Sequence, residues 1–186
     1  MSLGPLMIDL ATDCMSADEK ELLQSPQVGG VILFSRNFTS VEQLTLLIEE
    51  IHQLRHPKLL IAIDQEGGRV QRLREGFTQL PAIHLLGQIY DDDQKRACEL
   101  ATISGWLMAS ELRSIGVDFS FAPILDLNFG VSQVIGDRAF HKDPEVVSIL
   151  ATRYMQGMRD AGMQACLLYT SPSPRDATLA RMPSSA

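Results

Sequence analysis

The alternation of apolar, strand-like segments with helical segments constrains the fold of this chain more than any other feature of its sequence. Short apolar runs at residues 6–10, 31–34, 60–63 and 117–125 predict strands, and segments with helical periodicity or capping signals separate them. Strands and helices that alternate at this spacing form a parallel sheet with helical crossovers. The sequence therefore predicts an α/β fold, either an open doubly wound sheet or a (β/α)8 barrel. No G-x-G-x-x-G motif follows a strand, so dinucleotide binding of that kind has no support.

Capping signatures predict where the helices begin. Ser16 with Glu19, and Ser40 with Gln43, have the spacing of a capping box. Asp143 stands directly before a proline, which is a typical N-cap followed by a typical first helical residue. We therefore expect helices that begin near residues 17, 41 and 144.

Glycines predict where the later helices end. Gly116 follows the longest helical segment, residues 93–115, and Gly162 follows the segment that reaches Ala161. Residues 74–92 are less regular, with a short helix predicted after Pro81.

The number of strands indicates an incomplete barrel. A (β/α)8 barrel needs roughly 200 residues at least and about 250 typically, whereas this chain has 186 residues. Only four or five strands can be counted in it. We therefore expect a truncated (β/α)8 TIM-like barrel, the N-terminal half to two-thirds of one. Apolar residues meant for a closed core would then partly face water, among them Ile32, Ile61, Ile63 and Phe119.

Composition narrows the class of protein. A hydrophobic content of 45% with 21% charged residues is typical of a globular domain. A net charge of -7 argues against a general nucleic-acid binder. The sequence shows neither an 18-residue apolar run nor a signal-peptide pattern at its N-terminus, so no membrane partner is expected. Three scattered cysteines, Cys14, Cys98 and Cys166, fit a reducing compartment, and we expect a cytoplasmic location.

Charged residues are concentrated directly after the third predicted strand. The apolar run 60–63 leads into a short stretch with two carboxylates, two glycines and two guanidinium groups: Asp64, Glu66, Gly67, Gly68, Arg69 and Arg72. Parallel α/β folds build their ligand sites at the carboxyl ends of strands. Carboxylates accept hydrogen bonds and guanidinium groups donate them in pairs, so this set suits a polyhydroxylated ligand such as a sugar. The alternative is a solvated, charged loop.

The last part of the chain has a different character. MQACLLY begins another strand-like segment, but TSPSPRDATLARMPSSA follows it, with three prolines, four serines and no sustained apolar periodicity. Such a segment does not extend a parallel sheet, and it resembles translated vector or adaptor sequence. We expect residues 1–165 to form the barrel part and residues 166–186 to be a non-native or disordered tail.

Five segments together resemble glycoside hydrolase family 3. They are VGGVILFSRNF, AIDQEGGRVQRL, GWLMASELRSIGVDFSFAPILDL, IGDRAF and GMRDAGM. In order and spacing they resemble the N-terminal half of the family's bacterial cytoplasmic β-N-acetylglucosaminidases (β-hexosaminidases). The resemblance implies a (β/α)8-like barrel that removes terminal N-acetylglucosamine with retention of configuration. It further implies action on peptidoglycan turnover fragments (N-acetylglucosaminyl-anhydro-muropeptides), no cofactor or metal, and a monomer when full length.

The resemblance also implies three substrate-binding residues. Asp64 matches the carboxylate that accepts hydrogen bonds from the hydroxyls of the non-reducing sugar, Arg72 matches a donor to the same ring, and Arg138 in IGDRAF matches a third contact. Their structural alternatives are a turn cap for Asp64, a surface ion pair for Arg72 and a local pair with Asp137 for Arg138.

Three neighbouring residues are given supporting roles. We interpret Glu66 and Arg69 as scaffolding of the site, and Asp126 as a support of its rim.

No catalytic residue can be assigned in this chain. The family continues with a KHFPGHG-type motif that adds sugar contacts, then a mobile loop with the His of an Asp-His acid/base pair, then a nucleophilic Asp. Here CLLYTSPSP stands at the place of the first motif, and nothing after it matches. Since retaining hydrolysis needs both a nucleophile and an acid/base, we expect this chain itself to be inactive.

Two other functions stay open from the sequence. One is a non-catalytic, sugar-binding half-barrel that keeps Asp64, Arg72 and Arg138. The other is a different α/β-barrel enzyme that uses Asp64 and Glu66 as its acids. His52 and His56 have a metal-binding spacing on a predicted helix, but no third ligand accompanies them, so a solvated helix face is the better interpretation.

Overall fold

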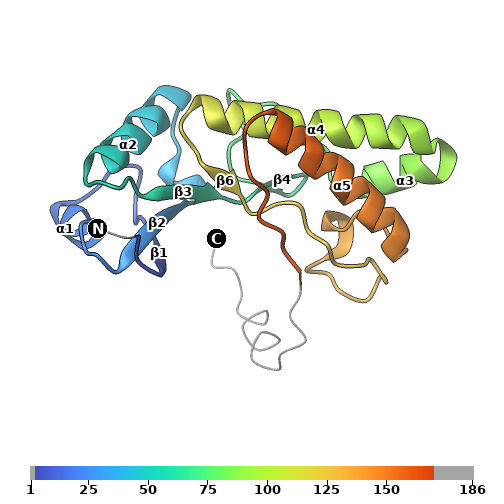
Figure 1. The fold of residues 1–186 in the computed structure, drawn as a ribbon, viewed down its shortest axis with the longest axis horizontal. Helices are drawn as coiled ribbons and strands as arrows, with labels where there is room; N and C mark the ends of the chain where they lie inside the picture. The colour runs from blue at the N-terminus through green and yellow to red at the C-terminus, as the bar shows by residue number, and fades with distance from the viewer. Residues whose placement is uncertain (1–2, 170–186) are drawn as a thin grey trace.

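The computed structural model describes residues 3–169 and shows a parallel sheet with helices packed along it (Figure 1). The sheet has the strand order β1-β2-β3-β6, and all neighbours are parallel. Its strands are β1 (Leu6–Asp9), β2 (Val28–Leu33), β3 (Leu60–Ile63) and β6 (Phe119–Ser120). A separate antiparallel ribbon is formed by β4 (Gln65–Gly67) and β5 (Val70–Gln71). The predicted α/β class is therefore confirmed.

Helices connect the strands. The α-helices are α1 (Ala17–Leu23), α2 (Val41–Gln53), α3 (His84–Asp92), α4 (Gln94–Ser114) and α5 (Pro144–Asp160), and two short 3-10 helices are η1 (Ser35–Asn37) and η2 (Gly136–Arg138). In Figure 1, α2 and α4 lie on one side of the sheet, and the chain after α5 passes beside β6. No helix in this part of the chain is both long and apolar enough to cross a membrane.

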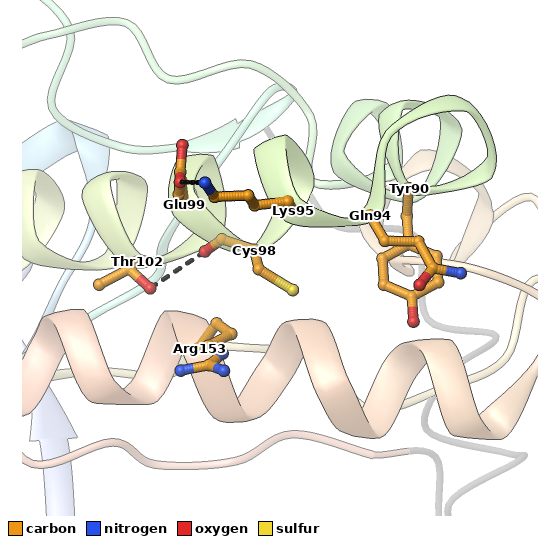
Figure 2. Close-up of a pocket in the computed structure, with 7 residues that line it drawn as sticks. All are labelled: Tyr90, Gln94, Lys95, Cys98, Glu99, Thr102 and Arg153. Atoms are coloured by element: carbon orange, nitrogen blue, oxygen red, sulfur yellow. Dashed lines mark hydrogen bonds and ion pairs between the residues drawn. The ribbon is translucent and has the colours of Figure 1, made fainter.

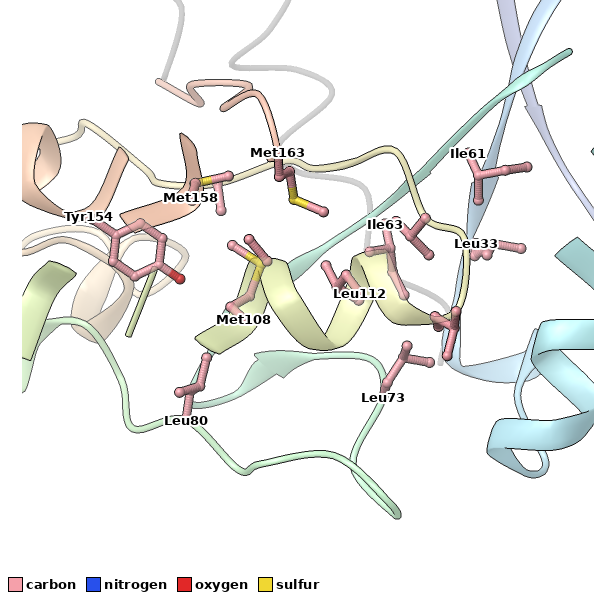
Figure 3. Close-up of a cluster of buried hydrophobic side chains, with 14 of the residues drawn as sticks. Leu33, Ile61, Ile63, Leu73, Leu80, Met108, Leu112, Tyr154, Met158 and Met163 are labelled. Atoms are coloured by element: carbon pink, nitrogen blue, oxygen red, sulfur yellow. The ribbon is translucent and has the colours of Figure 1, made fainter. Parts of the chain in front are cut away.

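The two faces of the sheet differ in burial. Val31 is paired with Ile61 and Leu33 with Ile63, and these four side chains are fully buried on the helix side. Figure 3 shows Leu33, Ile61 and Ile63 beside Leu112 of α4. The expectation that Ile61 and Ile63 face water is therefore wrong.

The opposite face is open. Ile32 and Phe119 are half-buried there, on either side of Ala62 in the register, and Leu60 is 40% exposed. The expectation of partial exposure is confirmed for Ile32 and Phe119.

All three predicted helix starts are confirmed, at Ala17, Val41 and Pro144. Ser16 accepts a hydrogen bond from the Glu19 backbone at 3.2 Å, and the Glu19 carboxylate accepts from the Ser16 backbone at 2.8 Å, which completes the capping box. Ser40 caps α2, but the Gln43 side chain accepts from the backbone of Thr39 instead, so this box is only half formed.

Strand boundaries differ more from the predictions. β2 begins at Val28 rather than at residue 31, because its glycines lie inside the strand. A Cβ on Gly30 would lie 2.8 Å from the Leu60 carbonyl oxygen, so the close approach of β3 requires a residue without a side chain. The strand predicted over 117–125 is reduced to Phe119–Ser120, and Pro123 follows it closely.

The chain returns to the sheet after α5. Leu168 donates to the Pro123 carbonyl at 3.1 Å, and its own carbonyl accepts from Leu125 at 2.7 Å, which makes a parallel bridge to Ile124. This bridge confirms the strand-like character predicted after Gly162. The remainder of the predicted tail, residues 170–186, lies outside the described residues.

Candidate functional site

A tight turn places four charged side chains at the carboxyl end of β3. The strand ends at Ile63, Asp64 follows, and the β4–β5 ribbon then folds the chain back within a few residues. Gly67 and Gly68 make this turn with φ angles of +100° and +58°, a region that residues with side chains rarely adopt. A Cβ on Gly67 would also lie 2.6 Å from the Pro81 carbonyl oxygen. The Gly-Gly pair is therefore needed to bring both ends of the DQEGGRVQR segment to the strand end.

Asp64 and Arg72 form the first ion pair of the site. The Arg72 Nη2 donates to Asp64 Oδ2 at 2.8 Å, and both side chains stay partly accessible, at 32% and 21%. The Arg72 guanidinium also lies over the Phe34 ring at 5.6 Å, an arrangement that supports a cation-π contact. Its buried Nε has no hydrogen-bond partner among residues 3–169. Arg72 is thus oriented on two sides and keeps donor capacity.

Gln65 holds the backbone that carries Arg72. Its Oε1 accepts from the backbone N–H groups of Arg72 at 2.9 Å and Leu73 at 3.1 Å, and its Nε2 donates to the Leu73 carbonyl at 3.0 Å. Its own backbone N–H donates to the Ser120 hydroxyl at 3.0 Å, which links the turn to β6. Gln65 is only 3% exposed. The sequence prediction missed this residue, and an amide between two acids at the end of an apolar strand was the available signal.

Glu66 and Arg138 form the second ion pair. The carboxylate accepts from Arg138 Nη2 at 2.6 Å and from Nε at 2.9 Å, a two-point contact across 72 residues of sequence. Glu66 is almost fully buried and Arg138 is 18% exposed. The hydrogen bonds that Arg138 donates to Glu66 raise the pKa of Arg138 above its usual value, and the charges of Asp64 and Asp126 act in the same direction. Arg138 does not pair with its neighbour Asp137, so the local alternative is wrong.

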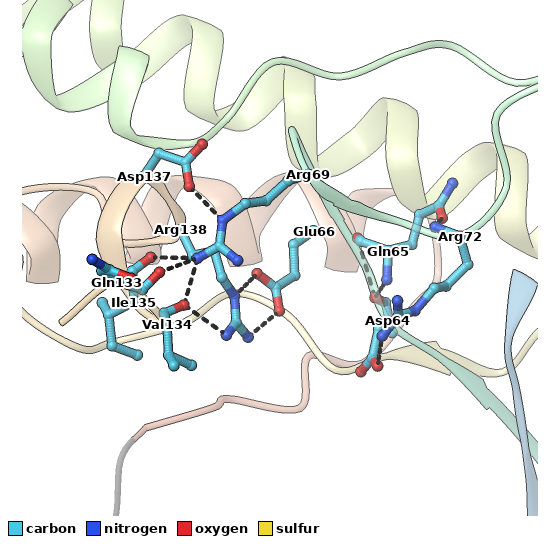
Figure 4. A network of polar contacts seen from close by, with 11 residues as sticks. Asp64, Gln65, Glu66, Arg69, Arg72, Gln133, Val134, Ile135, Asp137 and Arg138 are labelled. Carbon is cyan, nitrogen blue, oxygen red and sulfur yellow. Dashed lines mark hydrogen bonds and ion pairs between the residues drawn. The ribbon is translucent and has the colours of Figure 1, made fainter. Parts of the chain in front are cut away.

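Arg69 binds the loop that carries Arg138. Its Nε donates to Asp137 Oδ1 at 2.9 Å, and its Nη2 lies within hydrogen-bond distance of three carbonyl oxygens of that loop, those of Gln133, Val134 and Ile135. Figure 4 shows these contacts beside the Glu66–Arg138 pair. The structural interpretation of Glu66 and Arg69 agrees with their contacts.

The structure thus brings the three predicted binding residues to one end of the sheet. Asp64 and Arg72 contact each other, and Arg138 lies close enough for the charge of Asp64 to affect it. Asp126 is half-buried and its charge also reaches Arg138. Such a group of hydrogen-bond acceptors and paired donors at strand carboxyl ends can bind a ligand with several hydroxyls.

Other polar clusters lie elsewhere. α2 ends at Gln53, so His56 is outside the helix, and His52 instead lies 3.9 Å from Asp118. Burial lowers the pKa of His52, and the nearby Asp118 partly opposes this shift. Across residues 3–169, no three His, Cys, Asp or Glu side chains gather as metal ligands would.

A groove of about 550 Å³ between the outer helices is separate from the strand ends (Figure 2). Its polar groups contact one another, since the Thr102 hydroxyl donates to the Cys98 carbonyl at 3.0 Å and Lys95 pairs with Glu99 at 3.9 Å. The groove is lined by helix residues of α3, α4 and α5: Tyr90, Gln94, Lys95, Cys98, Glu99, Thr102 and Arg153. It contains none of the residues at the strand ends.

Comparison with known proteins gives consistent results. The family model for the glycosyl hydrolase family 3 N terminal domain matches residues 6–168. The chain is 62% identical over 165 residues to a β-hexosaminidase of Thioalkalivibrio sulfidiphilus, a match that covers 89% of this chain and 48% of that protein. A β-hexosaminidase of Alkalilimnicola ehrlichii is also 62% identical and is covered to 47%. The chain therefore spans about half the length of these curated relatives.

Solved structures support the same relationship. NagZ of Neisseria gonorrhoeae in complex with N-trifluoroacetyl-D-glucosamine is 48% identical, with a TM-score of 0.88 over 89% of this chain and 49% of that one. A family 3 β-N-acetylglucosaminidase of a Paenibacillus species is 36% identical, with a TM-score of 0.79. The parallel sheet described above is thus part of a TIM-barrel-like fold. From the family match, the sequence identities and the shared fold together, the chain belongs to glycosyl hydrolase family 3, through its N-terminal domain.

Proposed function

We propose that this chain is the sugar-recognising part of a β-N-acetylglucosaminidase that removes terminal N-acetylglucosamine with retention of configuration. The observation that carries the proposal is the presence of two ion pairs at the end of β3, Asp64–Arg72 and Glu66–Arg138. Together they present the accessible carboxylate of Asp64 and the oriented guanidinium groups of Arg72 and Arg138. A pyranose ring with neighbouring hydroxyls can donate to the carboxylate and accept from both guanidinium groups.

The proposal extends to substrate and location. The expected substrates are N-acetylglucosaminyl-anhydro-muropeptides from peptidoglycan turnover, and the expected compartment is the cytoplasm. The three free cysteines, Cys14, Cys98 and Cys166, support this location. A monomer without cofactor or metal is part of the same proposal.

The proposal includes a boundary in the chain. The boundary expected from the sequence lies between residues 165 and 166, with residues 1–165 as the barrel part and residues 166–186 as a foreign segment. The bridge from Leu168 to Ile124 and the family match to residue 168 favour a junction a few residues later, and the proline- and serine-rich composition after residue 169 supports a foreign segment from there. Sequencing the genomic DNA beyond the codon for Cys166 tests it, and a reading frame that continues into TSPSPRD would contradict it.

The alternative enzyme that uses Asp64 and Glu66 as its acids fits the geometry less well. Glu66 is 3% exposed and its carboxylate is bound at two points by Arg138. Asp64 is bound by Arg72. Both carboxylates therefore serve first as partners of guanidinium groups.

Replacing Asp64 tests the proposal. We consider a full-length enzyme in which residues 1–165 of this chain are followed by the second half of the Thioalkalivibrio sulfidiphilus relative, hereafter the fusion enzyme. Asp64→Ala should lower kcat/KM for 4-nitrophenyl N-acetyl-β-D-glucosaminide roughly 30- to 1,000-fold, or about 2–4 kcal/mol, because a charged acceptor for sugar hydroxyls is lost.

The matched control is Asp92→Ala, at an exposed position at the end of α3. It should leave kcat/KM unchanged. An Asp64→Ala enzyme as active as the unaltered fusion would remove Asp64 from the site. An unaltered fusion enzyme that neither hydrolyses the glycoside nor binds N-acetylglucosamine would contradict the proposed function itself.

A further inference from the structure

The DQEGGRVQR segment has contacts on two separate sides. Asp64 and Arg72 contact each other, whereas Glu66 and Arg69 both contact the loop of residues 133–138 (Figure 4). This loop lies between β6 and α5, and among its residues only η2 has regular structure. Its shape therefore depends on contacts from elsewhere in the molecule.

Arg69, which lies outside this loop, donates to three of its backbone carbonyl oxygens. Three successive carbonyl oxygens lie near its Nη2, at 3.1, 2.5 and 3.3 Å, and Asp137 lies at 2.9 Å from its Nε. Three neighbouring carbonyls that point at one guanidinium group fix the local direction of the backbone. Arg138 follows this fixed stretch after only Gly136 and Asp137.

Arg69 holds the backbone of the loop, and Glu66 holds the side chain of Arg138 at its guanidinium group. It binds the edge formed by Nε and Nη2, so the Nη1 side is the one that remains for a ligand. Nη1 has only a long contact, 3.3 Å, to the Val134 carbonyl, which Arg69 also binds. The Val134 carbonyl thus accepts from both Arg69 and Arg138. Displacement of the loop would therefore also displace the Arg138 side chain.

We infer that Glu66 and Arg69 are positioning residues that act on the sugar through Arg138. Glu66 selects which edge of Arg138 faces the ligand, and Arg69 sets the position of the backbone from which Arg138 extends. This inference rests on the proposed function, because it takes Arg138 as a sugar contact. It adds two residues that determine the geometry of recognition without contacting the sugar.

The ion pair with Asp137 does not account for the role of Arg69. Both side chains of that pair are nearly half exposed, at 46% and 47%, and exposed ion pairs contribute little free energy because water screens them. Arg69 instead uses two nitrogens at once, Nε toward Asp137 and Nη2 toward the three carbonyl oxygens, and the single nitrogen of a lysine cannot reproduce this fork. The shape of the side chain should therefore matter more than its charge.

A set of variants of the fusion enzyme tests the inference. Arg69→Ala should weaken binding of N-acetylglucosamine, measured by titration calorimetry, and raise KM for the aryl glycoside, each roughly 10- to 100-fold. Arg69→Lys should recover little of this loss. The exchange of Arg69→Asp with Asp137→Arg should not recover it either, because it restores the ion pair without the carbonyl contacts. Glu66→Gln should cause a loss of similar size.

The decisive measurement combines Arg69→Ala with Arg138→Ala. If Arg69 acts through Arg138, then removing Arg69 should have no further effect on sugar binding once Arg138 is absent. A purely structural role would lower binding and the melting temperature equally in both backgrounds. The matched control is Arg159→Ala, an exposed arginine on α5 whose guanidinium contacts Gln156.

The outcomes separate the inference from the proposed function. An Arg69→Ala enzyme with unchanged sugar affinity, or one with the same loss in the Arg138→Ala background, would overturn the inference and leave the proposed function standing. If Arg138→Ala and Asp64→Ala both leave the affinity unchanged, then the proposed function fails as well.

Discussion

The 186-residue chain is expected to show no hydrolysis of 4-nitrophenyl N-acetyl-β-D-glucosaminide above background, whereas the fusion enzyme hydrolyses it. Retaining hydrolysis needs a nucleophile and an acid/base on opposite sides of the scissile bond. At the end of β3, the carboxylates of Asp64 and Glu66 are instead bound by Arg72 and Arg138. The geometry of the described site therefore suits the binding of a sugar, and its two carboxylates serve as partners of guanidinium groups rather than as nucleophile or acid/base.

Two variants make this prediction specific. Retaining turnover by the chain itself that disappears in Asp64→Asn or Glu66→Gln would show that the chemistry lies in the described residues. The measurement should follow product release and anomeric configuration by NMR, so that a trace of a contaminating hydrolase can be recognised. Loss of all activity on adding a chelator would point instead to a metal-dependent reaction.

The fold was predictable where the determining contacts are local. Ser16 with Glu19, and Asp143 before Pro144, are contacts within one helical turn, and both begin helices in the structure. The extent of β6 was not predictable from composition. It depends on which of its residues can pair with Ala62 and Ile63, and only Phe119 and Ser120 do so.

The site was predictable in its residue types but not in its pairing. Asp64 and Arg72 are eight residues apart, and the glycine turn between them makes their contact foreseeable. The Glu66–Arg138 pair spans 72 residues and depends on the path of the whole loop after β6. For the same reason the local pair of Arg138 with Asp137 looked plausible from the sequence. Long-range pairs of this kind need the tertiary structure.

Burial on the two faces of the sheet determines what we expect for stability. The side toward α2 and α4 is complete, since Val31, Leu33, Ile61 and Ile63 are fully buried. The other side leaves Leu60 40% exposed and Ile32 and Phe119 half-buried. In a closed barrel this side is the interior, where side chains from opposite strands fill the space.

The margins of the sheet are open as well. β1 is the first strand of the order and pairs only with β2 among the described residues, so one of its edges offers unpaired backbone groups. Beside the other margin, an open groove of about 270 Å³ runs along α5 and is lined by apolar side chains such as Leu125, Val147 and Met155. Both features expose surface that a closed barrel covers.

We therefore expect the isolated chain to lack a cooperative native state. A domain is stable by only about 5–15 kcal/mol, and each fully buried aliphatic side chain contributes roughly 1.5–3 kcal/mol. Incomplete burial of Leu60, Ile32 and Phe119, together with the open groove along α5, should remove most of that margin. The chain should then aggregate or behave as a molten globule, with strong far-UV and weak near-UV dichroism and binding of the dye ANS. The fusion enzyme is the matched control and should unfold in one sharp transition. A soluble monomer of the 186-residue chain with an equally sharp transition would contradict this expectation, because it would show that the helix-side core alone stabilises the sheet.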